Sequence, residues 1–350
     1  MTAVGCQNAR KPTMSLVNVF KSSLFKTTTL TAAINATETP PQRIAQLGLF
    51  EEQGVPTTSV VIERKNSRLD IAPVLPRGAD PTPMKDPTRQ GVSLVIPHVP
   101  VRDRLMADEL QDVREFGSED QLVGIEAARD EKLQTMDDTL TVTEEYHRLG
   151  AIQGLILDED GSVLLDLYDE FEVTEPAAIE IDVTREGWTI GDAGLLRAQF
   201  SGLKTQMRQI LGNKPVRGIW APCGDALYDQ VANHPEVIDT YRATMEAKDL
   251  RGDPSESFTY GGVIWEKYPG YGDVEMDADE CRFIPMGVPG LFISRYAPAN
   301  WFSAVNRKGL PRYAMATLDP TGEKWIDLEG QTNGLHICTR PEVLIPGRLK

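Results

Sequence analysis

The sequence predicts an α+β protein with an elongated shape. Three observations support this: a strand–loop–strand pattern spans residues 55–99, one long helical pattern spans residues 118–149, and short helices and strands follow one another through the second half. With 350 residues and a hydrophobic share of 41%, the chain is long enough for about two domains and a sizeable core.

Charge is distributed unevenly along the chain. The net charge is −16, but residues 1–50 carry five basic side chains and one acidic one, whereas residues 99–350 carry 25 basic and 45 acidic ones. An acidic body repels nucleic acid outside any local basic face. The basic N-terminal stretch could dock on the acidic body of another copy or could be a solvated tail, and charge alone leaves both interpretations open.

No segment predicts a membrane span or a secretion signal. No apolar run approaches the roughly 20 residues that a bilayer requires, and the N-terminus lacks an apolar core followed by a cleavage site. The four cysteines lie far apart and form no CxxC pair, so they predict neither a zinc knuckle nor a redox motif. This cysteine usage fits synthesis in a reducing cytoplasm.

Residues 1–50 predict an extended arm with a short helix near Thr29–Asn35, which Pro40-Pro41 would stop. The arm is followed by a long hairpin, whose strands are the β-branched run 57–64 and the run 91–96. The segment between these strands contains five prolines and has too little apolar content to fold on a core of its own. Contact with a partner would order it, and without one we expect it to be mobile.

Residues 118–149 predict the longest helix. Ser118 and Gln121 form a capping box, and Gly150 follows as a C-terminal stop. A helix of 32 residues is roughly 48 Å long, which is as long as a small domain is wide, so we expect it to brace an elongated molecule. Its apolar face comprises Leu122, Ile125, Leu133, Met136 and Leu140.

The second half predicts short elements of both kinds. A hairpin over residues 153–167 turns at Asp160-Gly161. The elements expected after it are a helix at 196–210, a strand at 216–220, a helix at 225–233, and strands at 258–268 and 281–286.

The sequence contains no motif of a catalytic, nucleotide-binding or metal site. It has no GxSxG, GxxxxGK[ST] or HExxH motif and no GxGxxG after a strand, and its DEDG turn lacks the full spacing of a calcium-binding EF-hand. The acidic pairs Asp137-Asp138 and Glu144-Glu145 are expected on a solvated helix surface. His147 is expected to be solvated or to face the helix dipole. We therefore predict no catalytic, cofactor or metal-binding residue.

Nine stretches of the chain follow one another in the order of a known family. They are IAQLGLFEEQGVPTTSVVIE (44–63), VLPRGA (74–79), IPHVPVRDRLMADELQDVREFGSED (96–120), RLGAIQGLILDEDGSVLLDLYDEF (148–171), CGDALYDQVANHPEV (223–237), YGGVIWEKY (260–268), FIPMGVPGLF (283–292), YAPANWFSAVNRKGLPRYA (296–314) and ICTRPEVLI (337–345). In these stretches the chain resembles the major capsid protein E family, the lambda-type capsid proteins of tailed bacteriophages. Residues 1–14 look longer than the family's usual start, and residues 172–192 match only loosely.

The resemblance implies the Hong Kong 97-type capsid fold, an α+β fold with an axial domain that packs around the five- and six-fold axes of an icosahedral shell. The parts it implies are an N-terminal arm (1–50), an extended E-loop hairpin with its flanking strands (51–98), a peripheral domain (99–185) with a spine helix (118–149), an axial domain (186–292), and a C-terminal return to the peripheral domain (293–350).

The implied function is structural. The chain would be a major capsid protein that assembles as pentamers and hexamers into the icosahedral head shell, without enzyme activity, cofactor or membrane contact. The shell would enclose double-stranded phage DNA without sequence-specific binding. The resemblance implies a virion location after assembly in the host cytoplasm. It also implies a portal protein, a decoration protein and a separate scaffold protein, because the E-loop starts near residue 55 and leaves no room for a fused scaffolding domain.

Subunit contacts are expected from basic side chains, because guanidinium groups can pair bidentately with carboxylates of an acidic neighbour. Exposed pairs contribute only about 0–1 kcal/mol each, so several must act together. Some relatives join a loop lysine to an asparagine covalently, but the lambda-type resemblance favours a non-covalent shell. The residues expected at interfaces are Arg64, Lys65, Arg68, Arg77, Lys85 and Arg89 in the E-loop, and Arg10, Lys11, Lys21, Lys26 and Arg43 in the arm.

Two other functions are alternatives to a phage major capsid protein. An encapsulin-type nanocompartment protein has the same fold, and a cargo-enzyme gene beside it, rather than terminase and portal genes, would identify it. A hydrolase-like enzyme using Cys223 or Asp225 would need a base within hydrogen-bond reach, for which His234 is a candidate.

Overall fold

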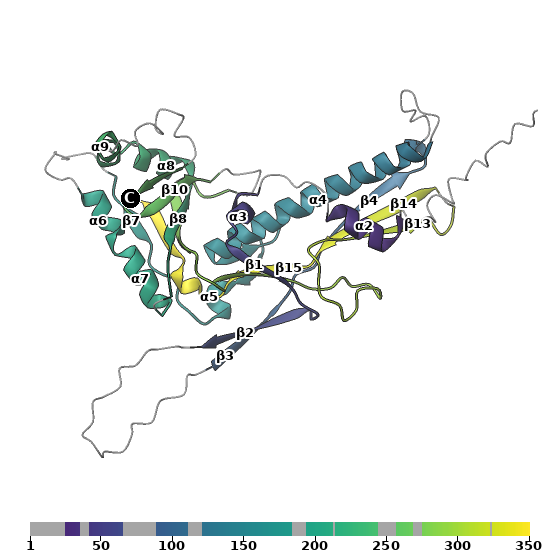
Figure 1. Cartoon of the computed structure of the whole chain (residues 1–350), viewed down its shortest axis with the longest axis horizontal. Coiled ribbons are helices and arrows are strands. Elements are labelled where there is room, and N and C mark those ends of the chain that lie inside the picture. Colours follow the sequence, from purple (N-terminus) through teal and green to yellow (C-terminus); the bar gives the residue numbers. More distant parts are fainter. Residues whose placement is uncertain are drawn as a thin grey trace, which may run out of the picture.

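The longest element of the computed structural model is helix α4 (Gln121–Gln153), which confirms the predicted long helix. It runs along the upper edge of the right-hand half of the molecule in Figure 1. Leu133, Met136 and Leu140 are buried as expected, whereas Ser118 and the side chains of Leu122 and Ile125 lie outside the described residues. The structure describes residues 25–35, 42–65, 89–110, 121–183, 194–212, 214–243, 257–268, 275–322 and 324–350.

The predicted stop of this helix at Gly150 is wrong. α4 continues through Gly150 and ends at Gln153, before Gly154, which has a positive φ of 90°. Gly150 is needed for another reason: a Cβ atom there would lie 2.7 Å from the carbonyl oxygen of Leu155, because the chain turns back against the helix.

Two small sheets lie beside α4. One has the order β13 (Tyr313–Leu318), β14 (Trp325–Thr332) and β4 (Val99–Met106), and the other has the order β1 (Phe50–Gly54), β12 (Phe292–Tyr296) and β15 (Gly334–Cys338). Helix α2 (Thr27–Ile34), close to the helix predicted in the arm, packs Leu30 and Ile34 against Leu133 of α4 and Ala314 of β13. Two short elements, α3 (Arg43–Gln46) and η2 (Asp108–Leu110), also contact α4.

A six-stranded sheet forms the body at the left of Figure 1. Its core is aromatic, with Trp265 in ring contact with Phe200, Phe258 and Phe283. The strand order is β7 (Ile179–Ile181), β16 (Ile345–Leu349), β11 (Glu280–Met286), β8 (Gly218–Cys223), β10 (Val263–Lys267) and β9 (Ser257–Tyr260). β7 and β16 therefore pair within this sheet, although they come from segments expected in the peripheral domain; the domain boundaries themselves stay a prediction.

Two elements predicted as single pieces are each divided. The helix expected at 196–210 is α6 (Leu195–Ser201) and α7 (Leu203–Ile210), and the strand expected at 258–268 is β9 and β10, joined at Gly261-Gly262. The other helices of this part are α8 (Asp225–Ala232), α9 (Pro235–Ala243) and η5 (Pro341–Val343).

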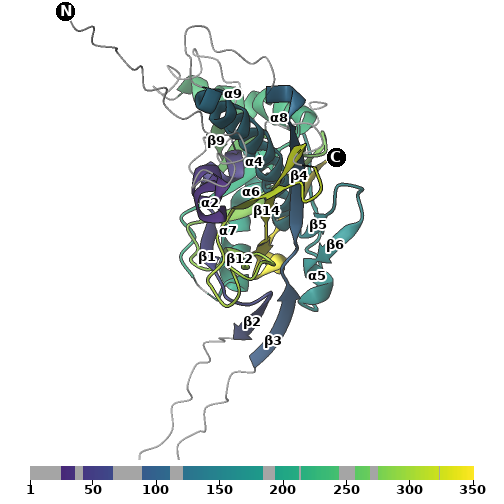
Figure 2. The same ribbon diagram turned by 90° about the vertical axis from the view of Figure 1, so that its right-hand side faces the viewer.

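Two predicted hairpins are confirmed. β2 (Ser59–Lys65) pairs antiparallel with β3 (Arg89–Val95), and this hairpin projects at the lower left of Figure 1. β5 (Leu155–Leu157) pairs with β6 (Val163–Asp166) and is followed by α5 (Leu167–Glu170). Figure 2 shows the β5–β6 hairpin standing out from one broad face of the molecule. The proline-rich segment between β2 and β3 lies outside the described residues.

The segment between β12 and β13, residues 297–312, is here called the rim loop, and its base is tightly packed. Val55 N donates to Tyr296 O over 2.8 Å, and Gly309 N donates to Val55 O over 3.0 Å. A Cβ atom on Gly309 would lie 2.0 Å from Tyr296 O, closer than any real contact. The three nearest atoms are all backbone atoms of Tyr296 and Ala297, so no flexible side chain can move aside.

We therefore expect Gly309→Ala to lower the free energy of unfolding by about 1–3 kcal/mol, the usual effect of overpacking. The measurement is chemical denaturation followed by tryptophan fluorescence. Gly218→Ala is the matched control, because a Cβ atom there meets nothing within 4 Å. Equal stability of the two variants would contradict the packing described for the base of the rim loop.

Candidate functional site

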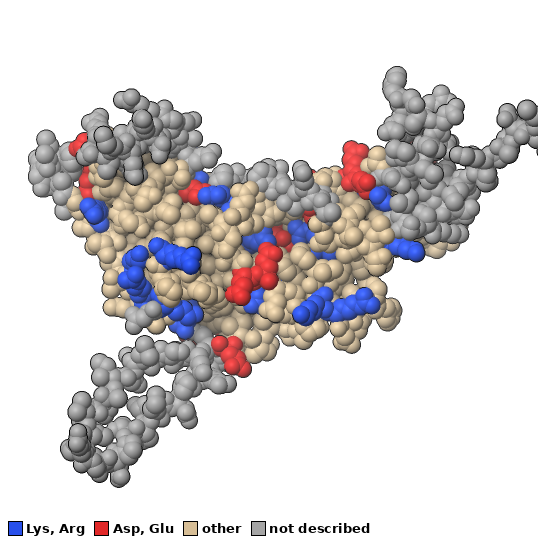
Figure 3. Space-filling view, viewed as in Figure 1, with Lys and Arg blue, Asp and Glu red and all other residues tan. Residues whose placement is uncertain are grey.

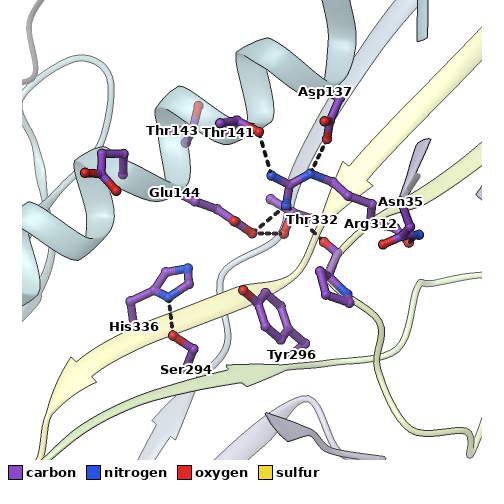
Figure 4. Close-up of polar contacts among 12 residues, drawn as sticks. Asn35, Asp137, Thr141, Thr143, Glu144, Ser294, Tyr296, Arg312, Thr332 and His336 are labelled. Atoms are coloured by element: carbon purple, nitrogen blue, oxygen red, sulfur yellow. Dashed lines mark hydrogen bonds and ion pairs between the residues drawn. The ribbon is translucent and has the colours of Figure 1, made fainter. Parts of the chain in front are cut away.

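A group of buried charged side chains lies between α4 and the strands beside it. We call it the central charge cluster, and Figure 4 shows its core. Only 1% of Asp137 and 3% of Glu144 is exposed. The expectation that the acidic pairs lie on a solvated surface is therefore wrong for Asp137, Glu144 and Glu145. The members of the cluster are Asp137, Glu144, Glu145, Arg148 and Arg312, all of them buried.

Arg312 joins the helix to the sheet. It directly precedes β13, and its guanidinium donates to Asp137 Oδ1 over 2.7 Å, to Glu144 Oε1 over 2.6 Å and to Thr141 Oγ1 over 3.1 Å. These acceptors are three to four residues apart and therefore lie on one face of α4. Thr332, at the end of β14, donates its hydroxyl to Glu144 Oε1 over 2.7 Å. The rigid fork of the guanidinium fixes the position of the sheet along the helix.

Arg148 and Glu145 extend the cluster toward the arm. Arg148 donates to Gln42 Oε1 over 2.6 Å and to Glu52 Oε1 over 3.2 Å, and it lies 3.5 Å from Glu144. Glu145 accepts the backbone N–H of Ile44 over 2.7 Å. The segment that contains α3 and β1 is thus held on α4 by polar contacts.

The electrostatics of the cluster follow from burial and pairing. Burial alone would raise the pKa of Glu144. The positive charges around it, Arg312 foremost, have the larger combined effect, and the pKa of Glu144 is lowered to about 2. For Asp137 and Glu145 burial is the larger effect, and it raises the pKa of each carboxyl. A buried charge without a partner is costly, so these groups must be held together.

His336 and Ser294 lie next to the cluster, with His336 Nδ1 2.7 Å from Ser294 Oγ (Figure 4). This spacing is that of a nucleophile and its base, yet both residues are buried. Burial, together with the charge of Arg148, lowers the pKa of His336 to about 3, which makes its imidazole a weak base. His147, expected to be solvated or to face the helix dipole, is also buried, and burial lowers its pKa. Ser294 and His336 therefore lack the exposure and the base strength that a nucleophile and its general base require.

The residues of the hydrolase alternative show no catalytic arrangement. Burial raises the pKa of the Cys223 thiol, and its Sγ–H donates to Ala221 O, so the thiolate that a nucleophile requires is disfavoured. Asp225 pairs with Lys267 over 3.1 Å, and His234 Nδ1 accepts the N–H of Glu236. Within the described part of the chain, no three metal-ligating side chains are grouped to hold an ion, and no helix is long and apolar enough to span a membrane.

Of the basic residues expected at interfaces, Arg43 is engaged within its own chain. It forms a bidentate ion pair with Glu266 of β10, which also accepts the indole N–H of Trp220 over 2.9 Å. Lys26 is exposed at the start of α2. Arg64, Lys65 and Arg89 lie on the paired backbones of β2 and β3, with side chains outside the described residues; Arg10, Lys11, Lys21, Arg68, Arg77 and Lys85 lie wholly outside them.

Arg312 should be essential for stability. Arg312→Met leaves Asp137 and Glu144 buried without their cation, and removing one partner of a buried pair costs about 3–5 kcal/mol. Arg348→Met is the matched control, because its ion pair with Glu280 involves a side chain that is 61% exposed, and exposed pairs contribute about 0–1 kcal/mol. Chemical denaturation of both variants gives the comparison. Similar losses would mean that the cluster does not anchor α4.

His336 predicts a pH-dependent stability. The unfolded histidine takes up a proton near pH 6.5, whereas the folded one stays neutral down to about pH 3. Between these pH values unfolding takes up a proton, so the free energy of unfolding falls as pH falls, by about 1.4 kcal/mol per pH unit from this group. We expect His336→Asn to reduce the slope measured by denaturation between about pH 6.5 and pH 4. The control is His98→Asn, at an exposed histidine; equal slopes in both variants would contradict the prediction.

Comparison with known proteins confirms both the family that the sequence resembles and the fold expected from that resemblance. The model of the family Phage major capsid protein E matches residues 26–349. The major capsid protein of Pseudomonas phage KPP10 is 24% identical, over 87% of this chain and 91% of that protein. The major capsid protein of Salmonella phage Felix O1 is 23% identical, over 95% of this chain and 98% of that protein.

A crystal structure described as that of a capsid protein from a prophage of E. coli CFT073 has a TM-score of 0.52 at 12% identity, over 93% of this chain and 99% of that one. Such low identity speaks for the fold alone, and the family match stands on the sequence. The chain, with its long helix, projecting hairpin and six-stranded sheet, therefore has the Hong Kong 97-type capsid fold and belongs to the phage major capsid protein E family.

Proposed function

We infer that this chain forms the head shell of a phage by associating with copies of itself. The observation that carries this function is the family match over residues 26–349, which includes every helix and strand that the structure describes. The architecture supports it, because α4 and the β2–β3 hairpin extend away from the six-stranded sheet (Figure 1) and present surface that one chain does not cover. As a virion component of this family, the chain acts as a structural protein.

The E-loop, residues 51–98, is proposed as the main clasp between subunits. Its hairpin has two different faces: Ile62 and Leu94 are buried, whereas Val61 is 64% and Val95 is 74% exposed. The inner face therefore fixes the hairpin on its own chain, and the outer face is free for a neighbour. The basic residues of the loop, Arg64 to Arg89, would then pair with carboxylates of that neighbour.

The arm is proposed as a second contact. Phe25, Leu30 and Ile34 are buried within the chain, so α2 anchors the arm, and the exposed Lys26 lies where the anchored part begins. Arg10, Lys11 and Lys21 precede this anchor in the sequence. An interaction of these side chains with acidic copies should weaken as salt screens it.

We also propose the symmetry of the shell and its other components. Pentamers and hexamers would build the icosahedral shell around double-stranded DNA in the host cytoplasm, with a scaffold protein, a portal protein and a decoration protein. The encapsulin alternative shares the fold, but the named relatives are phage major capsid proteins, which favours the head shell. Terminase and portal genes beside the gene would support the phage reading, and a cargo-enzyme gene would support the other.

The shell function is tested by replacing residues 66–88 with a short glycine linker. The seven residue pairs of β2 and β3 are retained, so we expect a folded chain that no longer forms closed particles. Negative-stain electron microscopy and sedimentation velocity measure the outcome, with the unmodified chain produced alongside the other head proteins of its phage. Intact shells should also dissociate on denaturing gels into one band near 38.7 kDa, because the shell is proposed to be non-covalent.

A matched control replaces the exposed turn at residues 159–161 of the β5–β6 hairpin with glycines, which alters a loop outside the proposed clasp. This control should assemble. Normal shells from the E-loop variant would contradict the clasp, a ladder of larger bands would contradict the non-covalent shell, and an unmodified chain that stays monomeric would contradict the shell function itself.

A further inference from the structure

The rim loop, residues 297–312, is rigid although it lies at the edge of the molecule. The rings of Trp301 and Tyr313 are in edge contact at 6.0 Å, and the backbone N–H of Leu310 donates to Tyr313 Oη over 3.0 Å. Ala304 N donates to Trp301 O over 2.9 Å, and the base is closed at Gly309. These contacts therefore fix the backbone from which the exposed side chains of the loop project.

Those exposed side chains are unusual for a free surface. Phe302 is fully exposed, Val305 is 56% exposed and Leu310 is 45% exposed. Arg307 and Lys308 are exposed beside them, and neither has an ion-pair partner within the described part of the chain. Figure 3 shows Lys and Arg side chains over this segment at the lower right. Aromatic side chains and arginines are both enriched in protein–protein interfaces, and a partner for this cationic surface should be acidic.

The outer face of α4 has the complementary properties. Glu131 and Asp138 are two turns apart and therefore share a face; Glu131 is exposed and has no ion-pair partner among the described residues. Between and beyond them lie Thr135, Thr139 and Thr143, whose hydroxyls donate to the carbonyls four residues earlier over 3.1, 2.9 and 3.0 Å.

These internal hydrogen bonds matter for docking, because a neighbour can cover the threonines without leaving a hydroxyl unsatisfied. Figure 4 shows Thr143 away from Arg312. At 3.6 residues per turn, Glu131, Thr135 and Asp138 share one flank of α4, which is rotated roughly a quarter to a third of a turn or more from the side that Arg312 contacts. The face thus offers Arg307 and Lys308 the exposed carboxylate of Glu131 and the half-buried carboxylate of Asp138, which also accepts Gln134 Nε2 over 2.9 Å. It offers threonine methyls to Phe302.

The positions of the two surfaces fit a shell. Figure 1 places α4 on the upper edge and the rim loop on the lower edge, and Figure 2 agrees on this vertical separation. A contact between opposite edges is head-to-tail, so it can be repeated from copy to copy and close into a ring.

A second acidic surface with exposed apolar side chains exists, but it fits less well. The β5–β6 hairpin carries Val163 and Leu164 beside acidic residues. It stands on a broad face of the molecule (Figure 2), so a contact there would stack copies instead of extending a single layer.

We propose that the rim loop of one copy binds the outer face of α4 in the next copy of the shell, with Phe302 as its anchor and Arg307 and Lys308 opposite Glu131 and Asp138. This inference rests on the proposed shell function, and it names a contact that neither the E-loop nor the arm supplies.

A charge swap tests the contact. The loop variant is Arg307→Glu with Lys308→Glu, the helix variant is Glu131→Lys with Asp138→Lys, and the swapped chain carries all four changes. Each two-residue variant should raise the concentration for half-maximal assembly by about tenfold, as like charges meet, and the swapped chain should return to near the original value. Sedimentation velocity and electron microscopy of the full chain, produced with the other head proteins, give the values, and circular dichroism checks the fold.

Two further variants make the test specific. Phe302→Ser removes a side chain that is fully exposed in its own chain, so the variant should fold normally. It should nevertheless raise the concentration for half-maximal assembly about 10- to 100-fold. Lys214→Glu with Arg217→Glu changes the net charge equally at exposed residues elsewhere, and any effect it has should not be rescued by the helix variant.

Several outcomes would overturn the proposal. One is normal assembly of the loop variant or of Phe302→Ser. Another is a swapped chain that does not recover although each two-residue variant is folded and defective. A third is rescue of the Lys214→Glu, Arg217→Glu control by the helix variant to the same extent. An unmodified chain that does not assemble would instead overturn the shell function, and this inference with it.

Discussion

The constraint on which this molecule depends is the length of α4, which no single hydrophobic core covers. Its C-terminal part, at Leu149 and Ile152, belongs to the main core with the six-stranded sheet, whereas Leu133 and Met136 belong to two separate small clusters with α2, β4, β13 and β14. The central charge cluster lies between these parts. Arg312 and Arg148 hold the strands and the arm where apolar contacts alone would leave the helix uncovered, and the rigid geometry of guanidinium pairs fixes their register.

This division of labour explains why a shell subunit buries so much charge. Well-packed apolar residues could stabilise the junction as well as ion pairs do, but they would specify its geometry less sharply. A subunit that must fit many copies of itself needs a defined shape along its whole length. The second junction has the same design, since Arg43 binds Glu266 and thereby connects the arm segment to the aromatic core through Trp220.

The helices and strands could be predicted largely from local patterns, whereas the site could not. Periodicity identified α4 and the hairpins β2–β3 and β5–β6, because apolar spacing and turn residues act locally. Asp137, Glu144 and Arg148 continue the spacing of the buried stripe at Leu133 and Met136, so the signal for their burial was present in the helical period. Residue type argued for solvent instead, and the partner that reverses this, Arg312, lies 175 residues from Asp137 in sequence. The end of α4 depended on the fold in the same way, because the chain turns back and packs Leu155 against Gly150.

The most direct test of the central claim is hydrogen exchange of the Arg312→Met subunit compared with the unmodified one. If the central charge cluster holds β13 and β14 on α4, protection from exchange should fall together in these strands and in the middle of α4. Strands β8, β10 and β11 of the six-stranded sheet should keep their protection. Unchanged protection in α4, or an equal loss in every element, would contradict the claim that buried charge, rather than the hydrophobic core, holds the two parts of the subunit in register.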